Sequence, residues 1–159
     1  MPNWCSGVLK VRGTKDNIVN FLKNGLQCVD IIGDDNGKHT VEVDETYDEI
    51  TMNDVKGALW IKNTRRNFIE NISHYLYLSK YSDDTFVCAI DGFQAAWGIE
   101  SKDLAEISKE YGIDLKIYAF EQGMQFNQDI EIVAGEVIKD EEIEFDNYEW
   151  ECINPLIGG

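Results

Sequence analysis

The residues of this chain that offer the most chemistry are its carboxylates, and they are clustered. The sequence has 30 Asp and Glu residues against 14 Lys and Arg residues, a formal net charge of −16 at pH 7. Nine carboxylates and a single lysine lie between Asp30 and Asp54, and eight carboxylates and a single lysine lie between Glu136 and Glu151. Grouped carboxylates can serve as acid–base pairs, as ligands of a divalent cation or as a docking surface for a basic partner.

A catalytic carboxylate pair needs burial, which the sequence does not predict for these groups. Acid–base chemistry near neutral pH requires a pKa that an apolar environment or a like charge has raised. The clustered carboxylates lie in segments that are predicted to be loops or solvated strand faces, so we interpret them as surface groups. The two histidines, His39 and His74, have no serine or cysteine beside them in a recognisable catalytic pattern. The sequence therefore nominates no catalytic residue.

Motifs for metals and cofactors are also missing from the sequence. Asp34-Asp35-Asn36-Gly37 has the composition of a calcium loop but neither its alternating ligands nor its distal glutamate, and a hairpin turn is the better interpretation. No Cys-x-x-Cys pair is available for zinc, and no glycine-rich phosphate loop occurs. We therefore expect no metal and no cofactor.

The remaining possibility is that the carboxylates bind a partner. Rows of carboxylates can imitate a phosphate backbone and compete for the Lys and Arg residues that neutralise phosphates. A solvated acidic surface with no partner stays an open alternative. The candidate partner-binding residues are Glu42, Asp44, Glu45, Asp48 and Glu49 in the first cluster, and Asp140, Glu141, Glu142, Glu144 and Asp146 in the second.

The overall charge limits what that partner is. A strongly acidic chain is repelled by nucleic acid and by anionic membranes, so we expect neither to bind directly. A basic host protein, such as a nucleic-acid-binding effector, is the expected partner. The only basic spot along the sequence is Lys62 with Arg65 and Arg66.

Length and composition predict one cytoplasmic domain. The 159 residues are a natural single-domain length, and 43% hydrophobic content argues against disorder. No apolar run is long enough to span a bilayer, and no signal peptide is evident. The four cysteines lie among apolar neighbours and are predicted to be buried free thiols, although Cys5 and Cys152 could be close in space. The four tryptophans are predicted to be core or core-edge anchors.

In the first half of the chain, periodicity predicts strands around one helix. Trp4–Arg12 alternates, with Leu9 and Val11 on one face and Lys10 and Arg12 on the other. Thr14 is a predicted helix N-cap, and the helix ends near Gly25. The other segments are strands at 29–32, 39–43 and 58–61, a hairpin turn at 33–37, a polar loop at 44–57 and an ambiguous apolar run at 68–78.

In the second half, a helix is predicted from an N-cap at Ser101 to Gly112, after a strand at 85–90. The strand at 113–120 alternates, with Lys116, Tyr118 and Phe120 on one face. Short strands follow at 130–134 and 136–138, then an exposed turn at 140–142 and a last strand at 143–145. This order predicts an α+β fold of ferredoxin-like type, with two helices packed on a mostly antiparallel sheet. Residues 1–159 form one domain, and 44–81 form an irregular middle insert.

Several short segments support this fold by resemblance. The chain begins Met-Pro-Asn-Trp-Cys-Ser, has Gln-Ala-Ala-Trp-Gly at 94–98 and Phe-Glu-Gln-Gly-Met-Gln-Phe at 120–126, continues with Gly-Glu-Val at 135–137 and ends in two glycines. In this order the segments resemble the YubB-type ferredoxin-like domain family, which groups uncharacterised small proteins carried by phages and plasmids. The family's prolines after the tryptophan are absent, Gln122 and Gln125 stand where the family has proline and glycine, and residues 44–81 match nothing in it. The resemblance implies a ferredoxin-like fold and an origin in mobile DNA, and it implies no activity.

Charge clusters and resemblance together predict a function. We expect a non-enzymatic protein of a phage or other mobile element, cytoplasmic in its bacterial host. It would inhibit a host nucleic-acid-binding defence protein, as anti-CRISPR or anti-restriction proteins do, by presenting DNA-mimicking carboxylate patches. A self-associating structural or regulatory protein, with sheet edges paired into a homo-oligomer, is the alternative. A divalent-cation-dependent enzyme is a weaker one.

Overall fold

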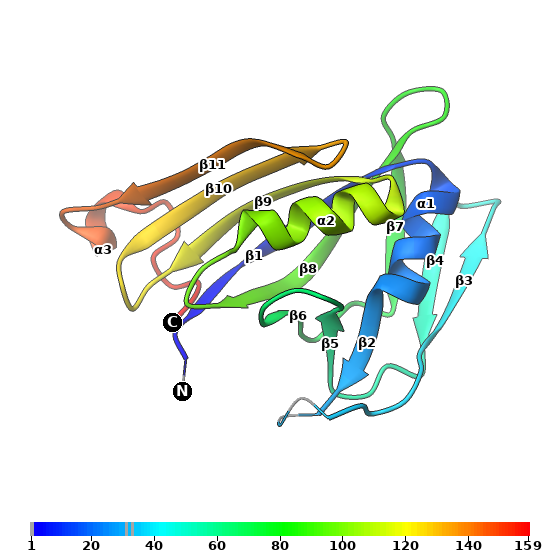
Figure 1. Ribbon diagram of the computed structural model, residues 1–159, viewed down its shortest axis with the longest axis horizontal. Helices are drawn as coiled ribbons and strands as arrows, with labels where there is room; N and C mark the ends of the chain where they lie inside the picture. Colours follow the sequence, from blue (N-terminus) through cyan, green and yellow to red (C-terminus); the bar gives the residue numbers. More distant parts are fainter. Residues whose placement is uncertain (1, 31, 33) are drawn as a thin grey trace.

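The computed structural model describes residues 2–30, 32 and 34–159, and an eleven-stranded sheet dominates it (Figure 1). The strands are β1 (Trp4–Gly13), β2 (Leu26–Val29), β3 (Thr40–Asp44), β4 (Glu49–Asn53), β5 (Ala58–Ile61), β6 (Asn67–Ile69), β7 (Tyr75–Lys80), β8 (Phe86–Ala96), β9 (Asp114–Glu121), β10 (Phe126–Val133) and β11 (Glu136–Glu144). The helices are α1 (Lys15–Asn20), the π-helical turn η1 (Phe21–Gly25), α2 (Ser101–Tyr111) and α3 (Tyr148–Glu151).

Strand β8 is the branch point of the sheet. On one side it pairs with β1, and the order continues through β9 and β10 to β11. On the other side two short strands share it, because β7 pairs with its beginning and β6 with its end. Strands β4 and β3 follow β7, whereas β5 and β2 follow β6. Every strand pairing in the described part of the chain is antiparallel.

A bulge at Gly92 lets β8 serve both branches. The register between β1 and β8 shifts between Gly7 and Leu9, opposite Gly92. Gly92 has a φ of 83°, and a Cβ there would collide with the carbonyl oxygen of Glu70. The Gly92 carbonyl also accepts a hydrogen bond of 2.8 Å from the Glu70 amide. Only glycine adopts this backbone conformation without strain, so this residue type is required at the fork.

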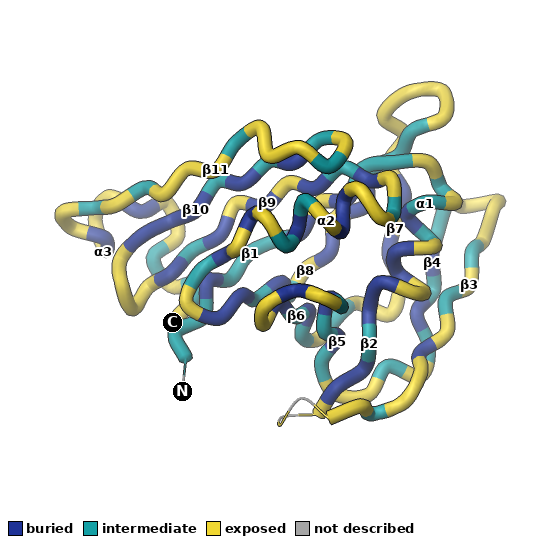
Figure 2. The backbone as a smooth tube through the Cα atoms, in the orientation of Figure 1, coloured by how far each residue is buried: buried dark blue, intermediate teal, exposed yellow. Residues whose placement is uncertain are grey.

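The central strands have one covered face and one open face. Helix α2 packs on β9, β10 and β11 (Figures 1 and 2), and its own residues Leu104, Ile107 and Ser108 are buried. Along β1 and β9 the other face carries exposed side chains, among them Lys10 and Lys116. The alternation of the sequence explains this division, because successive strand residues point to opposite faces.

Local sequence signals correctly predicted several elements. Strand β1 coincides with the predicted strand, and Leu9 and Val11 are fully buried as expected. The Thr14 hydroxyl caps α1 by accepting a 3.2 Å hydrogen bond from the Asn17 amide. Gly112 ends α2 in the left-handed conformation, with a φ of 62°. The predicted strand at 58–61 is β5.

The predicted ferredoxin-like α+β fold is wrong. The protein is dominated by an eleven-stranded antiparallel sheet and has only short helices among the described residues, so it is not the predicted two-helix ferredoxin-like α+β fold. The irregular middle insert at 44–81 was part of that prediction, and it instead contains four strands, β4 to β7. The predicted loop at 44–57 contains β4, in which Ile50 and Met52 are buried and alternate with partly buried residues. The ambiguous run at 68–78 divides into β6 and β7, because burial against the core selects the alternating conformation.

The C-terminal predictions also need correction. Asp140, Glu141 and Glu142 do not form a turn, and the predicted strand at 143–145 is not separate, because β11 runs through both segments to Glu144. Ser101 is the first residue of α2 rather than its N-cap, which is Glu100. The predicted hairpin turn at 33–37 and strand at 29–32 lie partly outside the described residues. No helix among the described residues has the length and apolar character needed to cross a membrane.

Candidate functional site

The two acidic clusters lie at opposite ends of the molecule. The first lies on the β3–β4 hairpin, and the second runs along β11 toward α3 (Figure 1). These two ends are separated along the longest axis of the molecule (Figure 1). The two acidic clusters therefore do not combine into one surface, and each is assessed separately.

The first cluster is largely occupied by contacts within the molecule. The Lys15 ammonium donates to Glu45 Oε2 at 2.7 Å and to Asp48 Oδ1 at 2.6 Å. Asp44 Oδ1 accepts from the Thr46 amide at 2.9 Å, which stabilises the hairpin turn. Glu49 is half-buried, and its hydrogen bond with Tyr77 raises the pKa of that phenol. Of the five predicted residues, Glu42 is the one left exposed with no such role.

The second cluster is more available. Its members Asp140, Glu141, Glu142, Glu144 and Asp146 are all exposed. Asp140 accepts a 2.5 Å hydrogen bond from the Ser101 hydroxyl, and Glu141 lies 3.9 Å from the Lys139 ammonium. Among the described residues, Glu142, Glu144 and Asp146 form no ion pair. Within the residues that the structure describes, β11 pairs only with β10 and forms an edge of the sheet.

Helix α3 and the residues that follow it carry large exposed hydrophobic side chains after the acidic row of β11. Trp150 is 87% exposed, and Ile153 and Leu156 are about as exposed. The prediction that the four tryptophans are core or core-edge anchors is therefore wrong for Trp150 and also for Trp97, which is 50% exposed. The Tyr148 hydroxyl anchors the helix by donating to Asn127 Oδ1 at 2.9 Å. We call Asp140, Glu141, Glu142, Glu144, Asp146 and Trp150 the β11–α3 surface.

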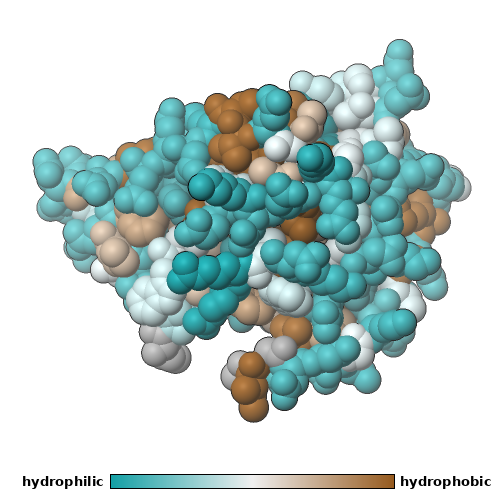
Figure 3. Space-filling view, viewed as in Figure 1, coloured by the Kyte–Doolittle hydropathy of each residue, from teal (hydrophilic) through white to brown (hydrophobic). Residues whose placement is uncertain are grey.

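The view of the molecule from the α2 side is largely hydrophilic (Figure 3). Hydrophobic side chains on that face form small separate groups rather than one continuous patch (Figure 3). Trp150 is among the most exposed of the large hydrophobic side chains that the structure describes, and it lies on a short, well-anchored helix. Such residues are often the anchors of protein–protein interfaces.

The cysteines are buried free thiols, as predicted. Burial raises the pKa of Cys5 and of Cys88 to about 12, so both stay protonated and unreactive at neutral pH. Burial alone would also raise the pKa of Cys152, but hydrogen bonds with Tyr148 and Asn127 outweigh it and lower that pKa. Cys5 and Cys152 contact neighbouring residues of β10, Gln128 and Asn127 respectively.

The predicted basic spot does not form a site. The Lys62 ammonium donates to the Asn24 carbonyl at 2.8 Å, and the Arg65 amide donates to Asp103 at 2.6 Å. The Arg66 guanidinium lies 5.8 Å from the ring centre of Trp4. The Lys62 and Arg66 side chains thus contact different parts of the structure, and the contact of Arg65 is made by its backbone amide.

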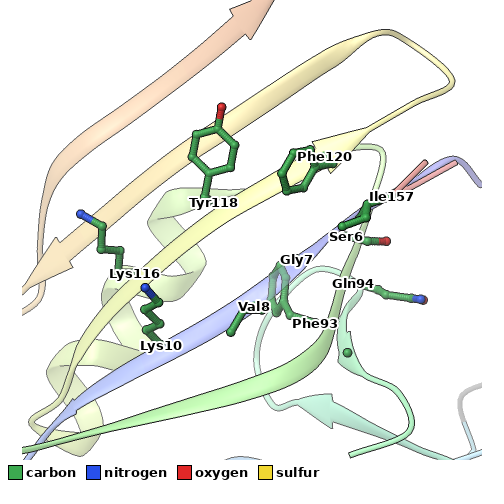
Figure 4. Close-up of a pocket in the computed structure, with 11 residues that line it drawn as sticks. Ser6, Gly7, Val8, Lys10, Phe93, Gln94, Lys116, Tyr118, Phe120 and Ile157 are labelled. Atoms are coloured by element: carbon green, nitrogen blue, oxygen red, sulfur yellow. The ribbon is translucent and has the colours of Figure 1, made fainter. Parts of the chain in front are cut away.

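Sequence reasoning missed a second basic spot that the sheet assembles. Lys10 of β1 lies directly opposite Lys116 of β9 on the open face, beside Tyr118 and Phe120 (Figure 4). The sequence contained both halves of this spot. Its alternation placed Lys10 on one face of the first strand, and it placed Lys116, Tyr118 and Phe120 together on one face of the strand at 113–120. What the sequence lacked was the pairing of these strands.

Within the described residues, no group of three or more His, Cys, Asp or Glu side chains is arranged to hold a metal ion. Comparisons of the chain with family models, curated proteins and solved structures found no match. The resemblance to the YubB-type family accordingly stays a prediction.

Proposed function

We propose that this protein is a non-enzymatic inhibitor that binds a basic, nucleic-acid-handling host protein through the β11–α3 surface. Encoded by a phage or another mobile element, it acts as anti-CRISPR or anti-restriction proteins do, by occupying the cationic groups that bind nucleic acid. The observation that carries the proposal is the row of carboxylates on the open edge strand β11, of which Glu142 and Glu144 have no ion-pair partner among the described residues.

The geometry of an edge strand supports this role. Asp140, Glu142 and Glu144 occupy alternate positions, so they point to one side of β11 at intervals of about 7 Å. A regular row of negative charges at an exposed edge can meet several Lys or Arg residues of a cleft at once. Each cation neutralised in this way makes the affinity more sensitive to salt.

The exposed tryptophan supplies what a purely acidic surface lacks. Charge complementarity accelerates association and orients partners, whereas buried aromatic anchors usually provide most of the binding free energy. Trp150 stands next to Glu149 and Glu151, just beyond the acidic row. An acidic rim around an aromatic anchor is expected of an interface whose affinity falls as the salt concentration rises and whose specificity comes from the buried anchor.

Self-association through β11 is the alternative that the open edge raises. Two β11 strands paired antiparallel would bring their carboxylates together at the new interface, which opposes the contact at low ionic strength. The charge of this edge therefore favours a basic partner over a second copy of the chain.

The test is capture of the partner from a bacterial host lysate, followed by a functional assay. The protein is immobilised, and bound proteins are eluted by raising salt from about 50 mM to about 200 mM. The captured protein must bind DNA or RNA, and purified inhibitor must displace its nucleic acid in a gel-shift titration. Recovery of a partner that retains its nucleic acid at saturating inhibitor would contradict the proposal.

Matched variants locate the surface. Glu142→Lys/Glu144→Lys and Glu42→Lys/Glu45→Lys change the net charge equally, one pair on β11 and the other on the β3–β4 hairpin. We expect the Glu142→Lys/Glu144→Lys pair to weaken partner binding about tenfold or more and the Glu42→Lys/Glu45→Lys pair to change it little. Equal losses from both pairs would show that only total charge matters.

Trp150→Ala should also weaken binding. The substitution should not unfold the protein, since the side chain is 87% exposed.

A further inference from the structure

A hollow on the open face of the central sheet has the features of a ligand site. It has a volume of about 510 Å³ and lies over β1, β8 and β9, on the side away from α2 (Figure 4). That volume is within the usual range for pockets that hold small molecules. Its lining combines the cationic Lys10 and Lys116 with Tyr118, Phe120 and Ile157. It is two strands away from β11 and plays no part in the function proposed above.

The hollow exists because of local departures from regular sheet geometry. The bulge of β8 at Gly92 lies where the register between β1 and β8 shifts, and Gly92 itself lines the hollow. Gly7, on the neighbouring strand, leaves no room for a side chain, because a Cβ would collide with the Tyr118 carbonyl oxygen. Glycines inside strands often mark bulges and sites where a ligand approaches the backbone. The floor of the hollow is thus backbone, and its walls are side chains of the flanking residues.

One end of the hollow is cationic in an otherwise acidic protein. Lys10 and Lys116 are directly opposite in the β1–β9 register and point to the same face. Like charges in this position repel each other. Lys116 donates to Glu131 Oε2 at 3.0 Å, but Lys10 forms no ion pair among the described residues. An anion between the two ammonium groups would remove this repulsion.

The nearby arginine is not available for the same purpose. Arg12 donates to Asp114 Oδ2 at 2.8 Å and lies 4.8 Å from the ring centre of Tyr81. Its contacts therefore hold the end of the sheet together. Among the described residues Lys10 has no ion pair and Lys116 pairs only with Glu131, so a phosphate at this end would contact Lys10 and share Lys116 with that carboxylate.

The other end of the hollow is aromatic. Tyr118 and Phe120 occupy alternate positions of β9, and their ring centres lie 5.3 Å apart at an interplanar angle of 65°. Val8 and Ile157 add apolar contacts, and Ser6 and Gln94 bring polar groups to the rim. Aromatic and aliphatic side chains of this kind pack against the face of a planar ring, while hydroxyl and amide groups bond to its edge.

We propose that this hollow binds a nucleoside monophosphate, with the phosphate at Lys10 and Lys116 and the base against Tyr118 and Phe120. A phosphate matches the two ammonium groups, and a base matches the aromatic end. A single mononucleotide fits better than a nucleic acid strand, because the net charge of −16 repels a polyanion that continues beyond the cationic end. The chemistry points to the ligand class and leaves all four bases as candidates.

Calorimetric titration of the intact protein tests this assignment. The probes are AMP, GMP, CMP and UMP, with inorganic phosphate, adenosine and an oligothymidylate of about eight nucleotides as comparisons. We expect at least one monophosphate to bind with a dissociation constant below about 1 mM, and phosphate and adenosine to bind about tenfold more weakly or not at all. Binding should weaken as salt is raised, because ammonium–phosphate attraction is screened.

Two lysine substitutions separate a site from general electrostatics. Lys10→Gln should weaken monophosphate binding about tenfold, whereas Lys102→Gln, an equal change of charge on exposed α2, should leave it unchanged. Thermal unfolding of both variants verifies that each is folded. The proposal is overturned if no monophosphate binds, if both substitutions act equally, or if the oligonucleotide binds more tightly than every monophosphate, in which case the face binds a strand. Because partner capture through β11 does not use these lysines, either proposal can fail alone.

Discussion

At the scale of single residues, two glycines show how backbone conformation and steric collision each limit which residue type a position accepts. Gly92 and Gly37 both have positive φ values, of 83° and 102°. At Gly92 an added Cβ would meet the backbone of Glu70, whereas at Gly37 it would meet nothing within 4 Å. Substituting alanine at each position therefore separates two contributions to the free energy of unfolding. Gly37 reports conformational strain alone, and Gly92 reports that strain together with a collision at the branch point of the sheet.

We expect Gly92→Ala to lower the free energy of unfolding by about 3 kcal/mol, the sum of conformational strain and forced movement of β6. Gly37→Ala should lower it by about 1 kcal/mol, since strain alone applies. Urea denaturation followed by circular dichroism measures both values. Equal losses would mean that the fork at β8 tolerates displacement and is not sterically determined.

At the scale of the elements, Ser108 joins α2 to the sheet. It is fully buried, its hydroxyl donates to the Ile113 carbonyl at 2.5 Å, and it accepts from the Gly135 amide at 2.9 Å. The first contact closes the C-terminus of α2 onto β9, and the second holds the turn between β10 and β11. One hydroxyl thus positions the helix and the edge hairpin that carries the acidic row.

We expect Ser108→Ala to destabilise the protein by about 2 kcal/mol, because it leaves a carbonyl and an amide without their partner. Ser82→Ala, the same change in an exposed turn, should stay within about 0.5 kcal/mol of the parent protein. Hydrogen exchange gives a local readout, since the Gly135 amide should exchange faster in the Ser108 variant alone. Unchanged protection of that amide would show that the turn is held by its other contacts.

The strand predictions also belong to this scale. The sequence predicted β1, β5 and α2 well because each carries its own periodicity and end signals. It failed at β4, where polar residues surround Ile50 and Met52 and the alternation is short. Composition favoured a loop there, but pairing with β3 and β7 buries one face, and this long-range contact outweighs local polarity.

At the scale of the whole molecule, the dominant quantity is the net charge of −16. Only a few carboxylates are in ion pairs within the described residues, so most of the charge repels itself across the surface. Self-repulsion of this kind destabilises the folded state relative to the unfolded chain. The interaction is screened by salt over the distances between exposed side chains.

We therefore expect the thermal unfolding midpoint to rise by several degrees as NaCl increases from about 0.01 M to about 1 M, since the Debye length falls from about 30 Å to about 3 Å. Differential scanning calorimetry measures the midpoint. The control is Glu141→Gln/Glu142→Gln/Glu144→Gln, which removes charges from β11 and should show a smaller rise. A midpoint that falls with salt would mean that the few ion pairs contribute more than the repulsion costs.

The candidate sites illustrate the same division between local and global information. Both acidic clusters could be found by reading along the chain, because their members are neighbours in sequence. Whether a carboxylate is available for a partner could not, since Lys15 reaches Glu45 and Asp48 from another element. The exposure of Trp150 was also hidden, because a tryptophan in an acidic segment is equally compatible with a core position.

The sequence by itself determined the charge, the buried free thiols and the elements with strong periodicity, because these depend on composition and on neighbours along the chain. Only the tertiary structure decided which carboxylates are in ion pairs and that the two acidic clusters lie at opposite ends of the molecule. It also decided that Lys10 lies opposite Lys116, beside two aromatic rings. The physical reason is strand register. Antiparallel pairing brings together residues that are distant in sequence, and the register is selected by burial of one face of each strand in the common core, which no single segment specifies.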